Sequence, residues 1–228
     1  MVCENQVSQS PYVRILNFDE EPVILEGDQE MEFHLIYQGK LHAASQSNPR
    51  TREKHEIRKE FHKQLSILWA TQPFLKEGAV QAGNRPTPTT ELMEMLGDRF
   101  SRCGYRFVPL VCKFFSVACS LDILLLRRDG PGAIIRSGGD IDNRVKLLFD
   151  ALRMPQNCGE LAGESPANDE NPFFCLLEDD SLITKVRVET NWLLSPPSPQ
   201  EHINDVHLVI RVKTVVAGSK RYEAAFHY

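Results

Sequence analysis

The chain has 228 residues, of which 42% are hydrophobic and 25% are charged; these values are typical of a folded globular protein and exclude a disordered chain. This length supports one substantial hydrophobic core, so we expect a single folded domain. The formal net charge of −5 argues against a generic nucleic-acid-binding protein, because such proteins carry an excess of basic residues.

The charge is distributed unevenly along the chain. Residues 1–32 hold eight acidic residues and one basic residue, Arg14, which is a local balance of −7. Subtracting −7 from −5 leaves +2 for the remainder. We therefore predict an acidic N-terminal segment over 1–32, either a solvated arm or a cover over a basic cleft. A single domain follows over 33–228, with insertions near 71–100 and 154–174.

The first predicted elements are a strand and a long helix. Phe33, Leu35 and Tyr37 fall at alternate positions and so on one side of an extended chain, which predicts a strand over 31–37. Apolar residues at helical spacing predict a helix that begins at Thr51, its candidate cap, and runs to about residue 70. We expect its basic residues to lie on the exposed surfaces of the helix: Arg52, Lys54, Arg58, Lys59 and Lys63.

The rest of the chain alternates between strands, helices and loops. In chain order we predict a loop over 71–90, a helix over 91–100, strands over 106–115 and 118–128 as candidates for antiparallel pairing, a glycine-rich turn, a helix from Asp140, an irregular segment over 154–174, and strands over 186–194 and 206–216. This order predicts an α+β fold in which a mixed or antiparallel sheet packs against a few helices, with extended loops.

Cysteine spacing and hydropathy suggest a location in the cell. The six cysteines form no Cys-x-x-Cys pair, so we interpret them as buried or inert thiols in a reducing compartment. No apolar run is long enough to cross a bilayer, and no signal peptide is visible at the N-terminus. We therefore expect a cytoplasmic protein without membrane contact.

The helix predicted from Asp140 carries the first group of chemically interesting residues. Asp142, Lys146 and Asp150 follow one another at one-turn spacing, on a different face from the apolar stripe. Asp140 caps the helix, where backbone amides favour anions. Taken alone, these features also fit a simple N-cap and an ordinary ion pair between Asp142 and Lys146.

A second acidic group, Glu178-Asp179-Asp180, follows the apolar run 173–177. Adjacent carboxylates repel one another unless they are solvated or share a cation, and hard oxygen ligands suit Mg²⁺ or Mn²⁺. Such an ion could polarise a phosphoryl oxygen and lower the pKa of an attacking water. Lys146 could neutralise developing negative charge or orient that water. Taken alone, the acidic group also fits a turn.

Together these motifs resemble those of the RusA-like endonucleases, the Holliday-junction resolvases of phages and bacteria. The matching parts, in the order of the family pattern, are a basic turn with Arg127, Arg128 and Arg136, then Asp140-Ile141-Asp142-Asn143, Lys146, Phe149-Asp150-Ala151-Leu152, and Asp179-Asp180. The resemblance covers residues 119–190. The chain departs from the family pattern in the insertion at 154–174 and in lacking a proline-rich loop after Tyr37.

The resemblance implies a Mg²⁺-dependent, homodimeric endonuclease, with Mn²⁺ as an alternative ion, that hydrolyses phosphodiesters in branched DNA during recombination and repair. It implies that Asp140, Asp142 and Asp180 are metal-binding catalytic acids and that Lys146 is the catalytic lysine. Asp179 is a further candidate ligand, and a contribution from Glu178 stays open. The candidate nucleic-acid contacts are Arg127, Arg128, Arg136, Arg144, Arg58, Lys59 and Lys63.

Two alternatives to a junction resolvase stay open. The first is a related metal-dependent nuclease that acts on RNA, a flap or another nucleotide substrate, with the same carboxylates and different surrounding loops. The second is a non-catalytic member that binds nucleic acid and whose acidic cluster is structural.

Overall fold

The computed structural model describes residues 31–43, 50–72, 89–128, 141–194 and 205–216, together with three short strands. These strands are β1 (Val13–Arg14), β3 (Val80–Ala82) and β4 (Arg85–Thr87), and they form a small sheet of their own. Little of the predicted acidic segment 1–32 falls within the described residues, so its role stays a prediction.

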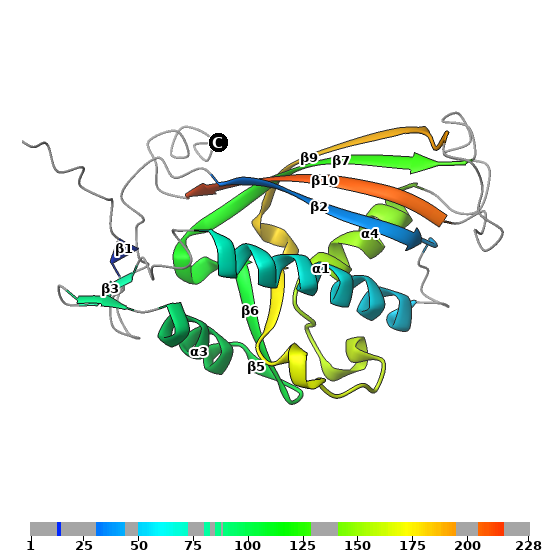
Figure 1. The fold of residues 1–228 in the computed structure, drawn as a ribbon. Helices are drawn as coiled ribbons and strands as arrows, with labels where there is room; N and C mark the ends of the chain where they lie inside the picture. The colour runs from blue at the N-terminus through cyan, green and yellow to red at the C-terminus, as the bar shows by residue number, and fades with distance from the viewer. Residues whose placement is uncertain are drawn as a thin grey trace, which may run out of the picture.

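A four-stranded sheet in the order β2-β10-β7-β9 forms the upper layer of the molecule in Figure 1. Its strands are β2 (Glu32–Lys40), β7 (Val117–Arg127), β9 (Ile183–Trp192) and β10 (Asp205–Val216). Strand β10 is antiparallel to β2 and to β7, whereas β9 is parallel to β7. Strands β2 and β9 therefore form the two edges of this sheet.

The lower layer combines a second sheet with the helices. The second sheet has the order β5-β6-β8 and contains β5 (Ser101–Arg102), β6 (Tyr105–Val111) and β8 (Phe173–Leu177). The helices are α1 (Thr51–Thr71), α3 (Thr89–Arg99) and α4 (Ile141–Leu152), and the short 3₁₀ turns are η1 (Lys113–Phe115), η3 (Cys158–Leu161), η4 (Asn168–Glu170) and η5 (Asp180–Leu182). This arrangement confirms the predicted α+β fold class.

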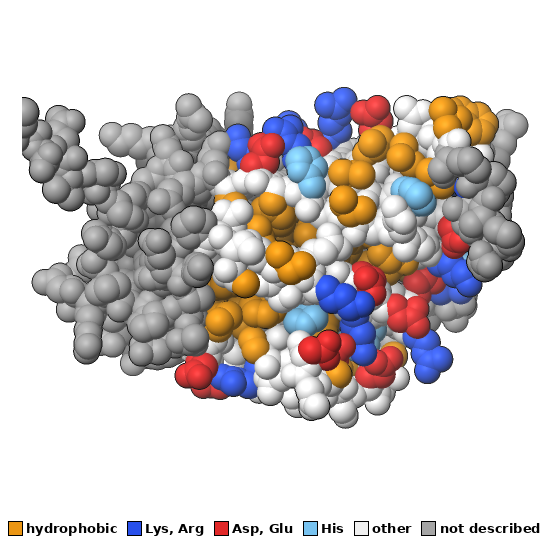
Figure 2. Space-filling model, viewed as in Figure 1, with side chains coloured by type: hydrophobic (Ala, Val, Ile, Leu, Met, Phe, Trp, Pro, Cys, Tyr) orange, Lys and Arg blue, Asp and Glu red, His pale blue; other side chains and the backbone are white. Residues whose placement is uncertain are grey.

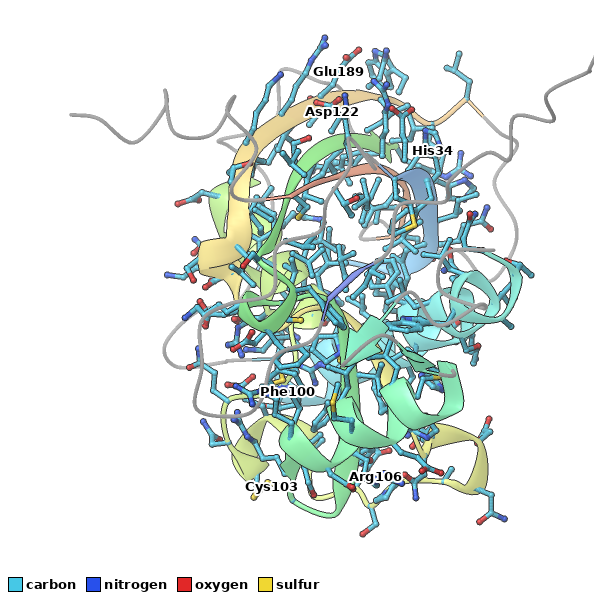
Figure 3. All side chains as sticks on the ribbon, turned by 90° about the vertical axis from the view of Figure 1, so that its left-hand side faces the viewer. His34, Phe100, Cys103, Arg106, Asp122 and Glu189 are labelled. Carbon is cyan, nitrogen blue, oxygen red and sulfur yellow. A yellow bond between two sulfur atoms is a disulfide. The ribbon has the colours of Figure 1, made fainter. Side chains whose placement is uncertain are left out.

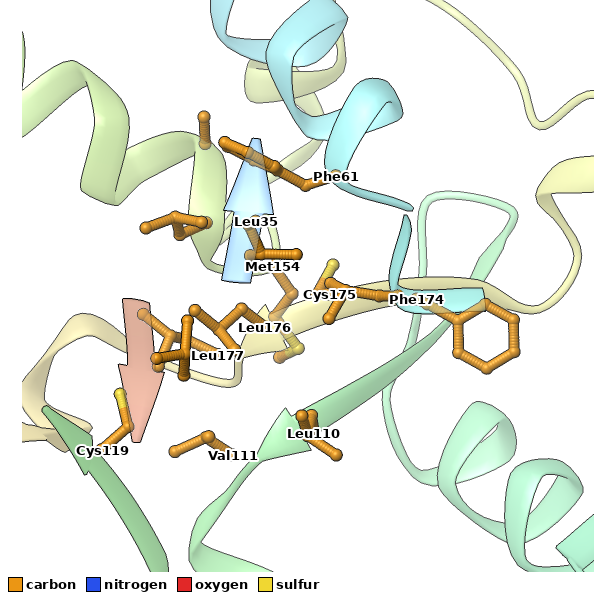
Figure 4. Packing of buried hydrophobic residues seen from close by; sticks show 14 of the residues in the cluster. Leu35, Phe61, Leu110, Val111, Cys119, Met154, Phe174, Cys175, Leu176 and Leu177 are labelled. Atoms are coloured by element: carbon orange, nitrogen blue, oxygen red, sulfur yellow. The ribbon is translucent and has the colours of Figure 1, made fainter. Parts of the chain in front are cut away.

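The hydrophobic core lies between the two layers. Figure 4 shows Phe61 of α1 and Leu35 of β2 beside the apolar run of β8, with Val111 of β6 and Cys119 of β7 across from them. All five residues of β8 are buried. A strand that is buried on both faces is continuously apolar, which explains why the run 173–177 does not alternate.

Two predictions about strands are wrong. The strands predicted over 106–115 and 118–128 do not pair with each other, because β6 pairs with β8 whereas β7 pairs with β10 and β9. Between them η1 and Ser116, which has a left-handed backbone (φ 50°), redirect the chain from one sheet to the other. The segment 71–90, predicted as a loop, contains the paired strands β3 and β4.

The five cysteines within the described residues divide into a bonded pair and three buried thiols. Cys103 and Cys158 form a disulfide, so the prediction that the cysteines are unpaired thiols is wrong for these two. Spacing gave no signal for them because they are separated by 55 residues. Burial raises the pKa of the Cys112, Cys119 and Cys175 thiols to about 12, which makes them inert.

Within the described residues, no helix has the length and apolar character needed to cross a membrane.

Candidate functional site

Helix α4 presents two of the four predicted catalytic residues, Asp142 and Lys146, on its exposed side. Asp142 and Lys146 are exposed, whereas Leu147 and Leu148 are buried in the core. Between them Arg144 is only 2% exposed, and its Nη1 donates to the backbone oxygen of Leu41, 2.6 Å away. This buried hydrogen bond fixes the first turns of α4 at the C-terminal end of β2.

Neither Asp142 nor Lys146 is held by another described side chain. Asp142 Oδ1 accepts a hydrogen bond from the amide of its neighbour Asn143 at 2.8 Å, and no ion pair joins Asp142 to Lys146 in the described part of the chain. The ordinary ion pair considered from the sequence is therefore not formed. Asp140, the predicted third member of this group, lies outside the described residues.

Asp150, on the same predicted face, has a structural role. Its carboxylate pairs with Lys54 Nζ at 3.0 Å and with Arg153 Nη2 at 2.7 Å. These bonds tie the end of α4 to α1. The face that carries Asp142, Lys146 and Asp150 therefore divides into an exposed N-terminal half and a paired C-terminal half.

The second acidic group also divides by role. Glu178 Oε2 accepts a hydrogen bond from the backbone amide of Lys113 at 2.8 Å. Asp179 Oδ1 accepts from the amide of Ser181 at 3.0 Å, and this hydrogen bond lowers the pKa of Asp179. Asp180, the first residue of η5, is exposed and has no bonded partner among the described side chains.

The structure does not bring Asp142 and Asp180 together. The amide of Met154 donates to the backbone oxygen of Leu177 at 2.9 Å, so the C-terminal end of α4 meets the end of β8, just before Asp180. Asp142 lies ten residues before Leu152, and a helix rises about 1.5 Å per residue, so about 15 Å of helix separates Asp142 from that end. In Figure 1, α4 accordingly extends away from the turn that leads into β9.

Among the residues that the structure describes, no cluster of three or more His, Cys, Asp or Glu side chains could hold a metal ion. Carboxylate ligands lie about 2.0–2.6 Å from Mg²⁺ or Ca²⁺, so Asp142 and Asp180 do not fit one shared ion in this arrangement. Spacing was a poor guide because it does not encode the direction of α4, whose C-terminal end meets β8 while Asp142 lies at its N-terminal end.

Three of the predicted nucleic-acid contacts, Arg58, Arg144 and Arg127, are buried. Arg58 is 1% exposed, and its guanidinium donates to the backbone oxygens of Asp150 and Arg153 at 2.8 and 3.2 Å. Arg144 is held by Leu41, as described above. The prediction that Arg58 lies on the exposed surface of the first helix is therefore wrong, as it is for Lys54, and neither Arg58 nor Arg144 presents its charge to solvent.

The remaining predicted contacts differ in accessibility. Lys59 is paired with Glu164 at 2.6 Å and Glu170 at 3.1 Å, and Lys63 with Glu60 at 2.6 Å. Arg128 is partly exposed, and Arg136 lies outside the described residues. On the face shown in Figure 2, basic and acidic side chains are intermixed. The described basic residues there do not form a patch of one charge.

A buried polar cluster between α1 and the insertion was not foreseen from the sequence. His55 is fully buried, with Arg58 Nη1 3.3 Å from its Nδ1 and the Tyr105 hydroxyl 3.4 Å from its Nε2. Next to His55 on α1, Lys54 pairs with Asp150, and one turn further along the helix Lys59 pairs with Glu164 of the insertion. These groups join α1, β6 and the insertion into one unit.

His62 extends this cluster toward β8. Its Nδ1 accepts a hydrogen bond from the amide of Phe174 at 2.9 Å, and its Nε2 donates to the backbone oxygen of Asp169 at 3.0 Å. Its ring stacks on Phe173 with centroids 4.5 Å apart. The separation of seven residues between His55 and His62 was the only sequence signal, because it places both on one face of a helix.

The cluster predicts a loss of stability in mild acid. Burial, together with the nearby charges of Arg58 and Lys59, lowers the pKa of His55 to about 4, although Glu164 and Glu170 oppose this shift. In the unfolded chain His55 binds a proton near pH 6.5, whereas in the folded protein it stays neutral to a lower pH. The contribution of neutral His55 to the folding stability is therefore fully present above pH 6.5. We expect the stability to fall as the pH drops toward 4, with a contribution from His55 of about 3 kcal/mol.

Urea unfolding between pH 7 and pH 4 measures this effect. In His55→Gln the pH dependence should be shallower than in the wild type. In His34→Gln, which alters an exposed histidine of β2, it should be unchanged. Equal slopes in the wild type and His55→Gln would contradict the assignment.

Comparisons with known proteins found no matching family model, no matching curated protein and no matching solved structure.

Proposed function

We propose that this protein is a metal-dependent, structure-selective endonuclease that hydrolyses phosphodiesters in branched DNA. The proposal rests on the succession of motifs that resembles the RusA-like endonucleases. The single structural observation that supports it is the position of Asp142 and Lys146. A carboxylate and an ammonium stand one turn apart on the exposed side of α4, and neither is neutralised by another described side chain.

The candidate active site in this proposal is the N-terminal end of α4. Asp142 would hold the ion, with its carboxylate oriented by the amide of Asn143, and Asp140 would be the second carboxylate. When bound there, Mg²⁺ or Mn²⁺ supplies Lewis acidity toward a phosphoryl oxygen. Lys146 contacts the phosphate and stabilises the negative charge that develops during hydrolysis. Arg144 positions both residues through its hydrogen bond to Leu41.

Asp179 and Asp180 have no assigned step in this arrangement, because Asp180 lies beyond the other end of α4. This position is the observation that favours the non-catalytic alternative, in which α4 and the acidic turn have structural roles.

Location in the cytoplasm also belongs to the proposal. The disulfide between Cys103 and Cys158 is unusual in that compartment, where thiols are kept reduced.

Cleavage of labelled substrates tests the proposed activity. Four-way junction, flap, linear duplex and single-stranded RNA are incubated with Mg²⁺, Mn²⁺ or EDTA, using wild type, Asp142→Asn and Asp98→Asn. Asp98 is a matched control, since it is an exposed acid on α3. We expect metal-dependent junction cleavage that falls at least about a hundredfold in Asp142→Asn, because even indirect metal contacts are worth roughly 10–100-fold.

The other outcomes are equally informative. Cleavage of only another substrate, with the same dependence on metal and Asp142, would keep the site and reject junction specificity. A folded wild-type protein that cuts nothing and gains no thermal stability from Mg²⁺ or Mn²⁺ would support the non-catalytic alternative, because a ligand that binds only the folded state stabilises it. Including Asp180→Asn shows whether the acidic turn participates at all.

A further inference from the structure

The two edges of the four-stranded sheet differ in how their backbone groups are satisfied. At the β2 edge, the side-chain amide of Gln64 on α1 bonds both backbone groups of Ile36, with the Ile36 amide donating at 2.9 Å and the Ile36 oxygen accepting at 2.7 Å. At the β9 edge, no described strand pairs with the side opposite β7. An edge strand of ten residues with unsatisfied backbone groups is a template for pairing with another chain.

The hydrogen bonds at the end of β9 show which of its residues face outward. The amide of Leu193 donates to the backbone oxygen of Arg127 at 2.7 Å, while Trp192 is the residue directly opposite Arg127. In a parallel pair, alternate residues direct both backbone groups to the same neighbour. Odd-numbered residues of β9 therefore face β7. The backbone groups of Val186, Val188 and Thr190 face away from the sheet.

The same strand exposes apolar side chains. The described chain has five large exposed hydrophobic residues, and three of them lie on β9 or directly after it: Val186, Trp192 and Leu194, exposed by 42%, 50% and 86%. In Figure 1, β9 forms the outermost strand of the upper sheet, and in Figure 3 its Glu189 lies at the edge of the molecule. Exposed apolar residues gathered along a free strand edge are typical of an interaction surface.

We propose that β9 pairs antiparallel with β9 of a second copy of this chain, about a twofold axis at Val188. In this register Val188 lies opposite the partner's Val188, and Val186 lies opposite the partner's Thr190. The outward backbone groups of these residues therefore meet as hydrogen-bonded pairs. The two four-stranded sheets become one continuous sheet of eight strands.

The charges of β9 favour this register over its neighbours. With the axis at Val188, Arg187 lies opposite the partner's Glu189, the symmetry repeats this pair, and no like charges face each other. An axis at Arg187 pairs Lys185 with the partner's Glu189 but places Arg187 opposite the partner's Arg187, and an axis at Glu189 places Glu189 opposite the partner's Glu189. Like charges directly opposite each other destabilise a strand pair, whereas opposite charges stabilise it. A twofold axis also requires the same surface on both copies, which an antiparallel self-pairing strand provides.

The occupant of the β9 edge is thus a second copy, and the inference does not depend on the proposed nuclease activity. The full chain is measured by sedimentation equilibrium as wild type, Arg187→Glu, Glu189→Arg, the double exchange, and Lys63→Glu as an exposed control on α1. We expect the wild type to dimerise. Each single reversal should weaken the dimer by roughly tenfold, because it creates two like-charge pairs, and the double exchange should restore it.

Cysteine crosslinking tests the register itself. Directly opposite residues in a hydrogen-bonded pair have Cα atoms about 5.5 Å apart, within the range of a disulfide. Val188→Cys should therefore form a covalent dimer. Thr190→Cys should not, because its two copies would be about 13 Å apart. A wild type that is monomeric at every concentration would overturn the proposal, as would dimers that are insensitive to both charge reversals. Crosslinking of Thr190→Cys alone would reject this register.

Discussion

Replacing Arg58 by methionine should lower the free energy of unfolding by about 3–5 kcal/mol, the typical cost of removing one member of a buried, hydrogen-bonded charge network. Methionine fills a similar apolar volume, so the decrease in the free energy of unfolding measures the contribution of the guanidinium group. Its removal leaves the backbone oxygens of Asp150 and Arg153 without their donor and takes a cation from beside Glu160, 3.8 Å away. Unsatisfied buried acceptors are costly because water no longer reaches them.

Urea unfolding followed by circular dichroism measures this loss. The matched control is Lys63→Met on the same helix, whose side chain is 60% exposed, and it should change the stability by less than about 0.5 kcal/mol. An Arg58→Met variant as stable as this control would mean that the buried network does not hold α1 to the insertion.

The second large effect is expected from the disulfide. Removing it in the double variant Cys103→Ser/Cys158→Ser should lower the free energy of unfolding by up to about 4 kcal/mol. The bond closes a loop of 55 residues, and the chain-entropy argument gives between about 3 and 4.7 kcal/mol for loops of about 15–100 residues. The bond joins the β5–β6 turn to η3, so the loss should appear first as local opening of the insertion.

Unfolding with and without a reducing agent separates the disulfide from other effects of the serine residues. Reduction should destabilise the wild type to the level of the double variant and should leave the double variant unchanged. Because Cys112, Cys119 and Cys175 are buried, alkylation of the folded protein under reducing conditions should label Cys103 and Cys158 before these three. A wild type whose stability does not respond to reduction would contradict the bond.

The sequence was a good guide wherever periodicity decides the structure. The long helix, the helix at 141–152 and the last strand were predicted close to their observed bounds, because apolar spacing fixes which face is buried. The sequence did not predict which strands pair, because β6 and β7 are both rich in apolar residues. No local pattern in either strand indicates which sheet it joins. The disulfide was missed for the same reason, since its cysteines are 55 residues apart. The β3–β4 pair is local by contrast, with only Gly83 and Asn84 between its strands, and this dipeptide was an overlooked hairpin signal.

The candidate site was predictable only in part. Asp142 and Lys146 lie exposed on α4, as expected for a site. Arg58 and Lys54 were expected on the surface, because counting apolar positions treats every charged residue as exposed. Their burial depends on partners from distant segments, such as Asp150 and Glu160. The separation of Asp142 from Asp180 follows from the path of the chain after α4, which spacing alone does not encode.

The backbone bond between Met154 and Leu177 gives the insertion a modular character. The insertion begins after α4 and ends before β8, and the hydrogen bond brings these two points together. The length of the insertion therefore does not determine the positions of α4 and β8. Closure entropy rises only slowly as such a loop grows. Gly163, exposed and with open space around it, is the natural point at which evolution or an engineer could splice in a further segment while the surrounding framework keeps its shape.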